Sequence, residues 1–205
     1  YGALYSGTHA TNFWTGPITL NGDCTIGQEW SDTELRISGA ISGPGGVTKI
    51  GSGRLYFEGT TANTYGGTTR VNRGTLLLGK TVGSGAVPND LIVGDGDGGP
   101  DADVVRVLNG SQIGDDAAVT VNSSGLVDLG SAGGERERIG SLAGSGHVEL
   151  GAGELWMTGP KSPPLWSTTF SGVIGGIGGS LRMDDVMGEF TLTGSNTYSG
   201  MTFVS

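Results

Sequence analysis

The chain has 205 residues, of which 42 are glycine and only 35% are hydrophobic, so it has little material for a thick globular core. The glycines show no three-residue period, which excludes collagen, and a charged fraction of 15% excludes the highly charged composition of a disordered chain. A net charge of −9 opposes binding to nucleic acid or anionic lipid, and no apolar run approaches the roughly 20 residues needed to cross a bilayer. We therefore expect a folded chain with many turns, no nucleic-acid partner and no direct membrane insertion.

The first 15 residues are rich in aromatic side chains and show no regular pattern. We expect residues 1–15 to form an irregular N-terminal segment or cap, with Phe13 and Trp14 folded over the first part of the regular structure as a lid. The lone Cys24 has no partner for an internal disulfide and alternates with Ile26, so we interpret it as a small buried hydrophobic residue.

From Ile18 onward, apolar residues come in pairs that are separated by one polar or exposed residue. This alternation is typical of a short strand with one buried face. Clusters of Gly, Asn, Asp and Ser lie between the pairs and supply the positive φ angles of tight turns. The pairs are Ile18/Leu20, Cys24/Ile26, Leu35/Ile37, Leu55/Phe57, Leu76/Leu78, Leu91/Val93, Val105/Val107, Val119/Val121, Val127/Leu129, Val148/Leu150, Leu155/Met157, Leu181/Met183 and Phe190/Leu192.

Internal repetition distinguishes a solenoid from a sandwich, because a solenoid is built from repeated units and a sandwich is not. The segment 38–46 returns as 171–179, and the tripeptide 63–65 (Asn-Thr-Tyr) returns as 196–198; both offsets are 133 residues. A looser copy of residues 41–57 runs from 142 to 157. We therefore predict an all-β fold, a right-handed parallel β-helix, with six to nine coils and a length of roughly 30 to 45 Å.

We predict a single β-helix over residues 16–205, with residues 159–165 (Gly-Pro-Lys-Ser-Pro-Pro-Leu) as a loop that bulges from one coil. The chain starts without methionine and its second repeat stops at Ser205. We therefore expect a fragment of a longer repeat protein, with the strand 202–204 pairing with more of the same chain or with another copy.

The segments GGVTKIGSGRLYFEG and NTYGGTTRVNRGTLLLG carry a family resemblance. They resemble the autotransporter-associated β-strand repeat, also called the passenger-associated transport repeat, over residues 38–79 and 171–205. The departures are an inserted Arg70, one residue lost after Tyr65, and Met201 and Phe203 in the last copy. The resemblance implies a right-handed β-helix in a secreted or surface-displayed bacterial protein, and it implies no catalytic residues.

One acidic turn resembles a calcium-binding loop. Asp95, Asp97, Asp101 and Asp103 lie close together with glycines between them, and calcium takes six to eight oxygen ligands from a flexible backbone. The spacing does not match an EF-hand, because no glutamate closes a twelve-residue loop. We favour a solvated acidic turn, keep calcium as the alternative, and expect no other cofactor.

The sequence gives little support to catalysis. The doublets Asp115-Asp116 and Asp184-Asp185 could act as acid and base in a polysaccharide-degrading β-helix, but adjacent residues of a strand point to opposite faces. His9 and His147 lie far apart without a nucleophile. The run Glu135–Arg138 alternates in sign, so we interpret it as an exposed strand edge or loop.

Three aromatic side chains are candidates for surface contacts: Tyr56, Trp156 and Phe203. Tyr56 and Trp156 fall between inward pairs at equivalent repeat positions, so both should point outward, where they could stack on sugar rings or be covered by the loop 160–166. The register predicts buried side chains at Leu55, Phe57, Leu76, Leu78, Val127, Leu129, Leu150 and Leu155. It predicts outward side chains at Tyr56, Leu77, Asp128 and Glu149.

These observations predict a non-enzymatic structural or adhesive segment of an extracellular or cell-surface bacterial protein. Its expected partners are further repeats, other copies of the chain and a surface glycan or other cell-surface molecule. The alternative is a carbohydrate-binding or polysaccharide-degrading β-helix. A groove lined by several carboxylates and aromatic residues would favour the alternative, whereas a flank of small and hydroxyl-bearing residues would favour the structural segment.

Overall fold

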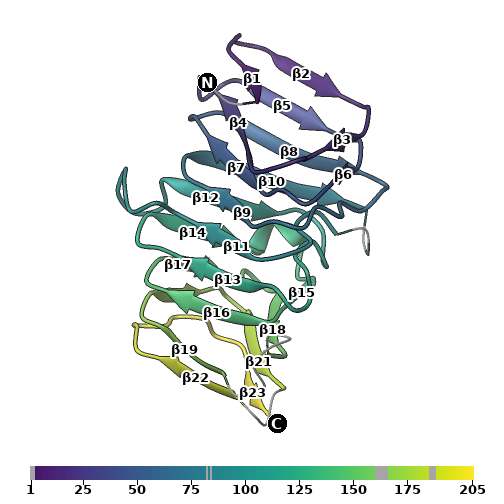
Figure 1. Ribbon diagram of the computed structural model, residues 1–205. Helices are drawn as coiled ribbons and strands as arrows, with labels where there is room; N and C mark the ends of the chain where they lie inside the picture. Colours follow the sequence, from purple (N-terminus) through teal and green to yellow (C-terminus); the bar gives the residue numbers. More distant parts are fainter. Residues whose placement is uncertain (1–2, 82, 84, 160–165, 185–187) are drawn as a thin grey trace.

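The computed structural model describes residues 3–81, 83, 85–159, 166–184 and 188–205. Within these residues the chain winds into a stack of coils made of short parallel strands (Figure 1). The one helical element described is a 3-10 turn, η1 (Gly130–Ala132). No described helix is long and apolar enough to cross a membrane.

Two long parallel sheets run the length of the stack. The nine-stranded sheet takes one strand from each coil, which gives about nine turns. Its strands are β1 (Leu4–Ser6), β4 (Cys24–Gln28), β7 (Val47–Ile50), β9 (Thr69–Val71), β11 (Leu91–Val93), β13 (Ala118–Val121), β16 (Ser141–Gly144), β19 (Trp166–Phe170) and β22 (Gly188–Leu192). The eight-stranded sheet contains β2 (Thr11–Trp14), β5 (Glu34–Ile37), β8 (Arg54–Gly59), β10 (Gly74–Lys80), β12 (Asp103–Val107), β14 (Gly125–Asp128), β17 (His147–Glu149) and β20 (Val173–Gly175).

The third face of the coils changes along the stack. It starts as a two-stranded sheet of β3 (Ile18–Thr19) and β6 (Ile41–Ser42), continues through loops that are joined by one bridge between Val87 and Ile113, and ends as a four-stranded sheet. The strands of that sheet are β15 (Arg136–Ile139), β18 (Glu154–Met157), β21 (Ser180–Met183) and β23 (Thr202–Val204).

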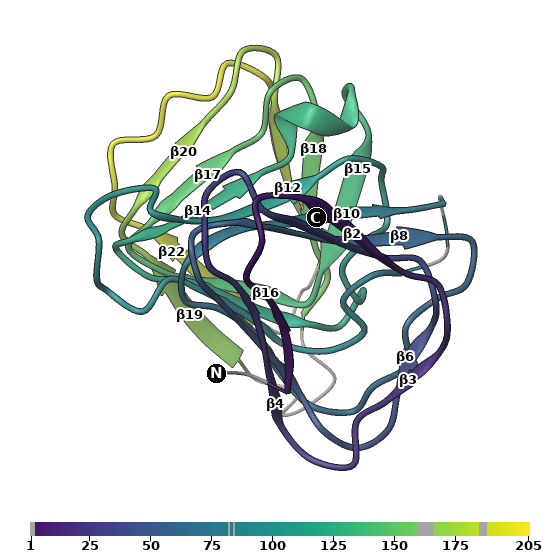
Figure 2. The same ribbon diagram turned by 90° about the horizontal axis from the view of Figure 1, so that it is seen from above.

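The coils are right-handed. Figure 2 looks down the stack from its N-terminal end, and the chain passes clockwise from β2 through β3 to β4 as it recedes from the viewer. Parallel crossovers take this hand in nearly all proteins, because twisted strands then pack back onto the sheet. The predicted right-handed parallel β-helix is therefore confirmed.

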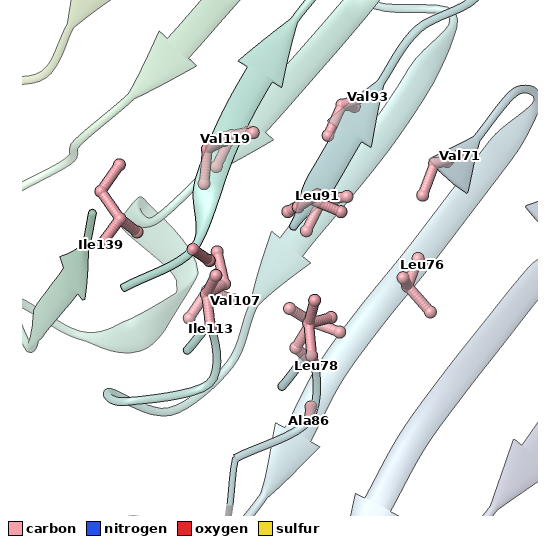
Figure 3. Packing of buried hydrophobic residues seen from close by; sticks show 14 of the residues in the cluster. Val71, Leu76, Leu78, Ala86, Leu91, Val93, Val107, Ile113, Val119 and Ile139 are labelled. Carbon is pink, nitrogen blue, oxygen red and sulfur yellow. The ribbon is translucent and has the colours of Figure 1, made fainter. Parts of the chain in front are cut away.

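The core is a narrow column of mostly aliphatic side chains inside the coils (Figure 3). In-register pairing stacks Leu55, Leu76 and Val105 on successive strands, so each inward side chain meets a similar one above and below. All eight side chains of the predicted inward set are buried. The apolar pairs nearest the two ends differ, because Ile18, Cys24, Phe190 and Leu192 are only half-buried.

The outward set is confirmed at three positions and wrong at one. Tyr56, Asp128 and Glu149 lie on the outer face and are half-buried. Leu77 occupies an outward position in the register, yet only 7% of it is exposed. It lies between Tyr56 and Arg106 on the two adjacent strands, and the long side chains of these neighbours flank it.

The N-terminal residues are more regular than expected. Leu4–Ser6 and Thr11–Trp14 form β1 and β2, which begin the two long sheets, so the expectation of an irregular segment is wrong there. Trp14 lines a pocket at the first coil together with Ile18 and Leu20, and it is 44% exposed. Phe13 pairs with Arg36, and its side chain is 69% exposed, so it does not close that end.

Equivalent repeat segments lie on different faces of the coil. Segment 38–46 contains β6 on the third face, whereas its copy contains β20 in the eight-stranded sheet. The strand that follows is β7 in the nine-stranded sheet in the first copy and β21 in the four-stranded sheet in the second. The repeat is therefore not a whole number of coils.

The repeated Asn-Thr-Tyr tripeptide makes two equivalent contacts in both copies. The side-chain oxygen of Asn63 accepts a hydrogen bond from the Ile41 amide at 2.9 Å, and Asn196 accepts one from the Ile174 amide at 2.9 Å. The Tyr65 hydroxyl lies 2.5 Å from the Thr69 hydroxyl, and the Tyr198 and Thr202 hydroxyls are 2.6 Å apart. Asparagine thus joins one coil to the coil before it, which is why this tripeptide recurs.

Candidate functional site

The four-stranded sheet carries a row of arginine and aromatic side chains on its outer face. Pairing places Arg138 of β15 beside Trp156 of β18, Trp156 beside Arg182 of β21, and Arg182 beside Phe203 of β23. We call these four residues the arginine–tryptophan row. Two of the three predicted contact residues, Trp156 and Phe203, are thus brought together.

Three guanidinium groups surround the Trp156 ring. The distances from the ring centre to the guanidinium carbons are 4.9 Å for Arg136, 5.0 Å for Arg138 and 5.2 Å for Arg182. Such contacts are attractive because the face of an indole ring is negative. The ring is half-buried by them, which leaves less of its faces for stacking on a sugar.

Each of these arginines also pairs with a carboxylate. Arg136 bonds to Glu154, Arg138 lies 3.2 Å from Asp115, and Arg182 lies 2.7 Å from Asp184. The hydrogen bond from Arg182 lowers the pKa of Asp184 below its usual value. The row is therefore close to electrically neutral, and its most accessible aromatic side chain is Phe203, 42% exposed.

Tyr56 lies apart from this row, on the eight-stranded sheet. The Arg36 guanidinium carbon lies 4.0 Å from the centre of its ring, and its hydroxyl donates a hydrogen bond to Glu34 at 3.2 Å. Tyr56 and Trp156 thus share an outward position and an arginine partner on two different faces. The loop proposed to cover them, residues 160–166, lies outside the described residues except for Trp166.

The acidic turn does not gather its four carboxylates. Asp103 is buried and accepts a hydrogen bond from the Ser124 hydroxyl at 2.6 Å, and its burial raises its pKa. One oxygen of Asp95 accepts the Asp97 amide at 2.9 Å, whereas the carboxylate of Asp101 faces His147. Among the described residues no three His, Cys, Asp or Glu side chains form a group that could hold a metal ion.

A polar groove lies beside this turn, with a volume of about 490 Å³. The exposed Arg73, the half-buried Asn72 and the carboxylates of Asp95, Asp97 and Asp103 line it. The groove therefore presents one cation and several carboxylates, but none of the sequence-predicted aromatic residues. It does not have the aromatic lining that would favour a carbohydrate site.

Sequence reasoning missed a buried carboxylate. Glu137 is 1% exposed, so the interpretation of the run 135–138 as wholly exposed is wrong. Its two oxygens accept hydrogen bonds from the Gln112 amide at 3.1 Å and from the Ile113 amide at 2.8 Å. β15 is the first strand of its sheet, and the preceding coil contributes a loop there whose two amides bind the carboxylate. Burial raises the pKa of Glu137 to about 7.

A buried lysine is the second polar group that was missed. Lys49 occupies an inward position between Ile26 and Val71. Its ammonium group donates hydrogen bonds to the Gly51 and Arg73 carbonyls, both at 2.8 Å. Burial lowers the pKa of Lys49 to about 7. The sequence signal was its place in the apolar alternation after Val47.

Two of the aspartates considered for catalysis lie near each other, and the two histidines lie far apart. Asp115 and Asp184 pair with arginines beside Trp156, and Asp185 lies outside the described residues. His9 bonds to Asp32 at 2.8 Å and stacks on Trp30 at the N-terminal end, whereas His147 lies on β17. The structure does not bring the two histidines together.

These features define a parallel β-solenoid. Its repeated unit contains short strands and an asparagine that bonds to the preceding coil. Residues 47–78 and 187–205 match the Passenger-associated-transport-repeat family, so the chain contains passenger-associated transport repeats. Over 146 residues, 71% of this chain, it is 32% identical to the adhesin BmaC autotransporter of Brucella suis biovar 1 (strain 1330). The chain spans 4% of that relative's length. No solved structure matches the chain.

Proposed function

We propose that this chain is a non-enzymatic structural and adhesive segment of a bacterial protein displayed outside the cell or on its surface. The observation that carries this proposal is the parallel solenoid of about nine turns, which is built on passenger-associated transport repeats. The similarity to a relative that is named an adhesin supports the adhesive part.

The geometry suits a stalk. Successive coils are joined by ladders of backbone hydrogen bonds on two long sheets, so bending the stack requires many bonds to be strained together. At a coil spacing of about 4.8 Å, nine turns extend over roughly 40 Å. Length, stiffness and a large lateral surface are the properties that such a segment contributes.

Displaying the segment tests the adhesive role. Beads coated with the folded segment should be retained on cultured host cells, and beads coated with the heat-unfolded segment should not. Incubation of the segment with a panel of polysaccharides should produce no new reducing ends. Release of reducing ends that is lost in Asp115→Asn would contradict the non-enzymatic part, and equal retention of folded and unfolded segments would contradict the adhesive part.

The second candidate function is carbohydrate binding through the arginine–tryptophan row. The exposed Phe203 beside Arg182 favours it, because an aromatic face and a guanidinium together can hold a sugar ring and its oxygens. A glycan array that is probed with the native segment and with Phe203→Ala tests this function. Binding that is lost in the variant supports it, and a blank array removes it.

The ends of the solenoid are the proposed sites of contact with further repeats or other copies. β23 pairs on one side with β21, and its Val204 is 76% exposed. An unpaired strand edge beside apolar side chains favours association. Light scattering at rising concentration should show association that Val204→Lys weakens, and a strictly monomeric native segment would count against contact between copies.

A further inference from the structure

The loop between β11 and β12 is longer than its counterparts in the adjacent coils. Asp103 pairs with Gly74, 29 residues earlier, whereas Thr75 pairs with Arg54, 21 residues earlier. The extra residues form the acidic turn 94–102, which projects from the corner between the two long sheets. This loop supplies acidic lining of the polar groove.

The base of the loop is held firmly. The Ser124 hydroxyl donates to the carboxylate of Asp103 at 2.6 Å and accepts from the Gly96 amide at 2.9 Å. Since Asp103 is buried, these bonds are shielded from water. The position of the loop tip depends on other contacts.

The tip reaches across the eight-stranded sheet to a histidine. Asp101, with a left-handed φ of 58°, places its carboxylate 3.5 Å from Nδ1 of His147. His147 lies on β17, which is separated from β12 by β14. One contact thus ties a residue of the loop to a strand two coils further along.

His147 has carboxylates on both sides. Asp101 faces Nδ1, and Glu149 of its own strand lies 3.8 Å from Nε2. The nearby charges of β14 and β12 are already paired, because Arg106 bonds to Asp128 at 2.8 Å. In β20 the residues that pair with His147 and Glu149 are Val173 and Gly175, which carry no charge. The imidazole therefore gains two electrostatic attractions when it is protonated.

We propose that His147 is a protonation-controlled latch for the loop 94–102. Histidine changes charge between about pH 5 and 8. When the ring is protonated it holds Asp101 and keeps the loop tip on the sheet, and the neutral ring holds it more weakly. Protonation thereby sets how firmly the loop that carries the acidic lining of the polar groove is positioned.

Hydrogen–deuterium exchange of the full chain tests the latch. After correction for the intrinsic pH dependence of exchange, the amides of residues 96–102 should open about two- to five-fold less often at pH 5.5 than at pH 7.5, the range expected for an exposed ion pair. His147→Gln and Asp101→Asn should each abolish this difference. His9→Gln, which removes the other histidine, should leave it unchanged.

Each outcome supports or overturns the latch. A loop whose corrected exchange does not respond to pH overturns it, as does a pH response that persists in His147→Gln. Exchange of β14 and β17 reports on the fold in every variant. Because Asp101 lies in an exposed turn, Asp101→Asn keeps the test decisive if His147→Gln disturbs the sheet.

Discussion

Individual polar side chains hold successive coils together inside the stack. Asn63 is the clearest example, because its amide accepts from the Ile41 amide of the preceding coil and donates to the Ala86 carbonyl of the next at 2.7 Å. Glu137 and Lys49 also bind backbone groups: Glu137 accepts hydrogen bonds from amides, and Lys49 donates hydrogen bonds to carbonyls. Buried backbone groups that lack a strand partner need such side chains.

Asn63→Ala should lower the free energy of unfolding by about 2 kcal/mol, because a buried amide and a buried carbonyl both lose their partner. Urea denaturation measures this change. The matched control is Asn21→Ala, since Asn21 is exposed, and it should change the stability by less than about 0.5 kcal/mol. Equal, small effects of the two substitutions would show that Asn63 does not join the coils.

Glu137 should make stability depend on pH. Its folded pKa, about 7, exceeds the ordinary 4.5, so the folded state binds the proton more tightly. The resulting stability is fully present below pH 4.5 and is lost as the pH rises to about 7. Over this window the difference in free energy of unfolding between the native chain and Glu137→Gln should fall by up to about 3 kcal/mol.

Urea denaturation at a series of pH values measures that difference, with Glu135→Gln as the control. Glu135 lies two residues away and is exposed, so its substitution should produce no comparable trend. A difference for Glu137→Gln that stays constant from pH 4.5 to 7 would contradict the buried, proton-binding carboxylate.

Elements are stabilised on their outer faces as well as in the core. In the four-stranded sheet the guanidinium groups of β15 and β21 lie against Trp156 of β18, which ties three coils together laterally. In the eight-stranded sheet Arg36 of β5 lies against Tyr56 of β8 in the same way. These contacts join strands whose residues are about one coil apart in the sequence.

Trp156→Leu should lower the free energy of unfolding by about 1 to 2 kcal/mol, because the guanidinium contacts are lost while an apolar side chain remains. Trp30→Leu is the matched control, since Trp30 is 45% exposed and stacks on His9 alone among the described rings. Thermal unfolding of both variants measures the contrast. If Trp30→Leu were the more damaging change, the outer row would not be a stabilising feature.

The acidic turn should not respond to calcium. Asp103 is hydrogen-bonded to Ser124 and Asp101 faces His147, so two of the four carboxylates already have other partners. Millimolar calcium should leave the unfolding temperature unchanged relative to the same concentration of magnesium. A rise that depends on calcium and disappears in Asp97→Asn would overturn this expectation, because ligand binding to the native state raises stability.

The inward-facing residues of the core strands could be predicted from the sequence. The contacts between residues on adjacent coils could not. Period-two alternation identified Leu55 and Phe57 as inward residues, because each strand shows its own two faces. Leu77 was misassigned because its burial comes from Tyr56 and Arg106, which lie on adjacent coils. Glu137 was misassigned because the amides that donate hydrogen bonds to it lie in a loop about 25 residues earlier.

The candidate site was predicted in part for the same reason. Repetition showed that Tyr56 and Trp156 occupy equivalent outward positions, and the structure confirms that both face outward with arginines beside them. The sequence did not show that Phe203 joins Trp156 while Tyr56 lies on another face. The face on which each aromatic residue lies depends on the number of strands between the two copies of the repeat. This number could not be counted from the sequence, because the loops between the strands are irregular.

The whole molecule is one right-handed stack in which the sequence repeat and the coil are out of phase. β9 and β23 are equivalent strands, yet β9 belongs to the nine-stranded sheet and β23 to the four-stranded sheet. Equivalent outward residues therefore appear on successive faces of the rod rather than along one edge. A long passenger built this way would display each kind of surface feature around its whole circumference.

Disulfide trapping in a Cys24→Ser background tests the stacking of the coils most directly. The structure pairs Arg182 with Phe203 on adjacent strands of the four-stranded sheet, whereas Thr191 of β22 lies on another face, in the nine-stranded sheet. Under mild oxidation the pair Arg182→Cys and Phe203→Cys should cross-link readily, and the pair Thr191→Cys and Phe203→Cys should not. The reverse result would contradict the proposed stacking of the coils.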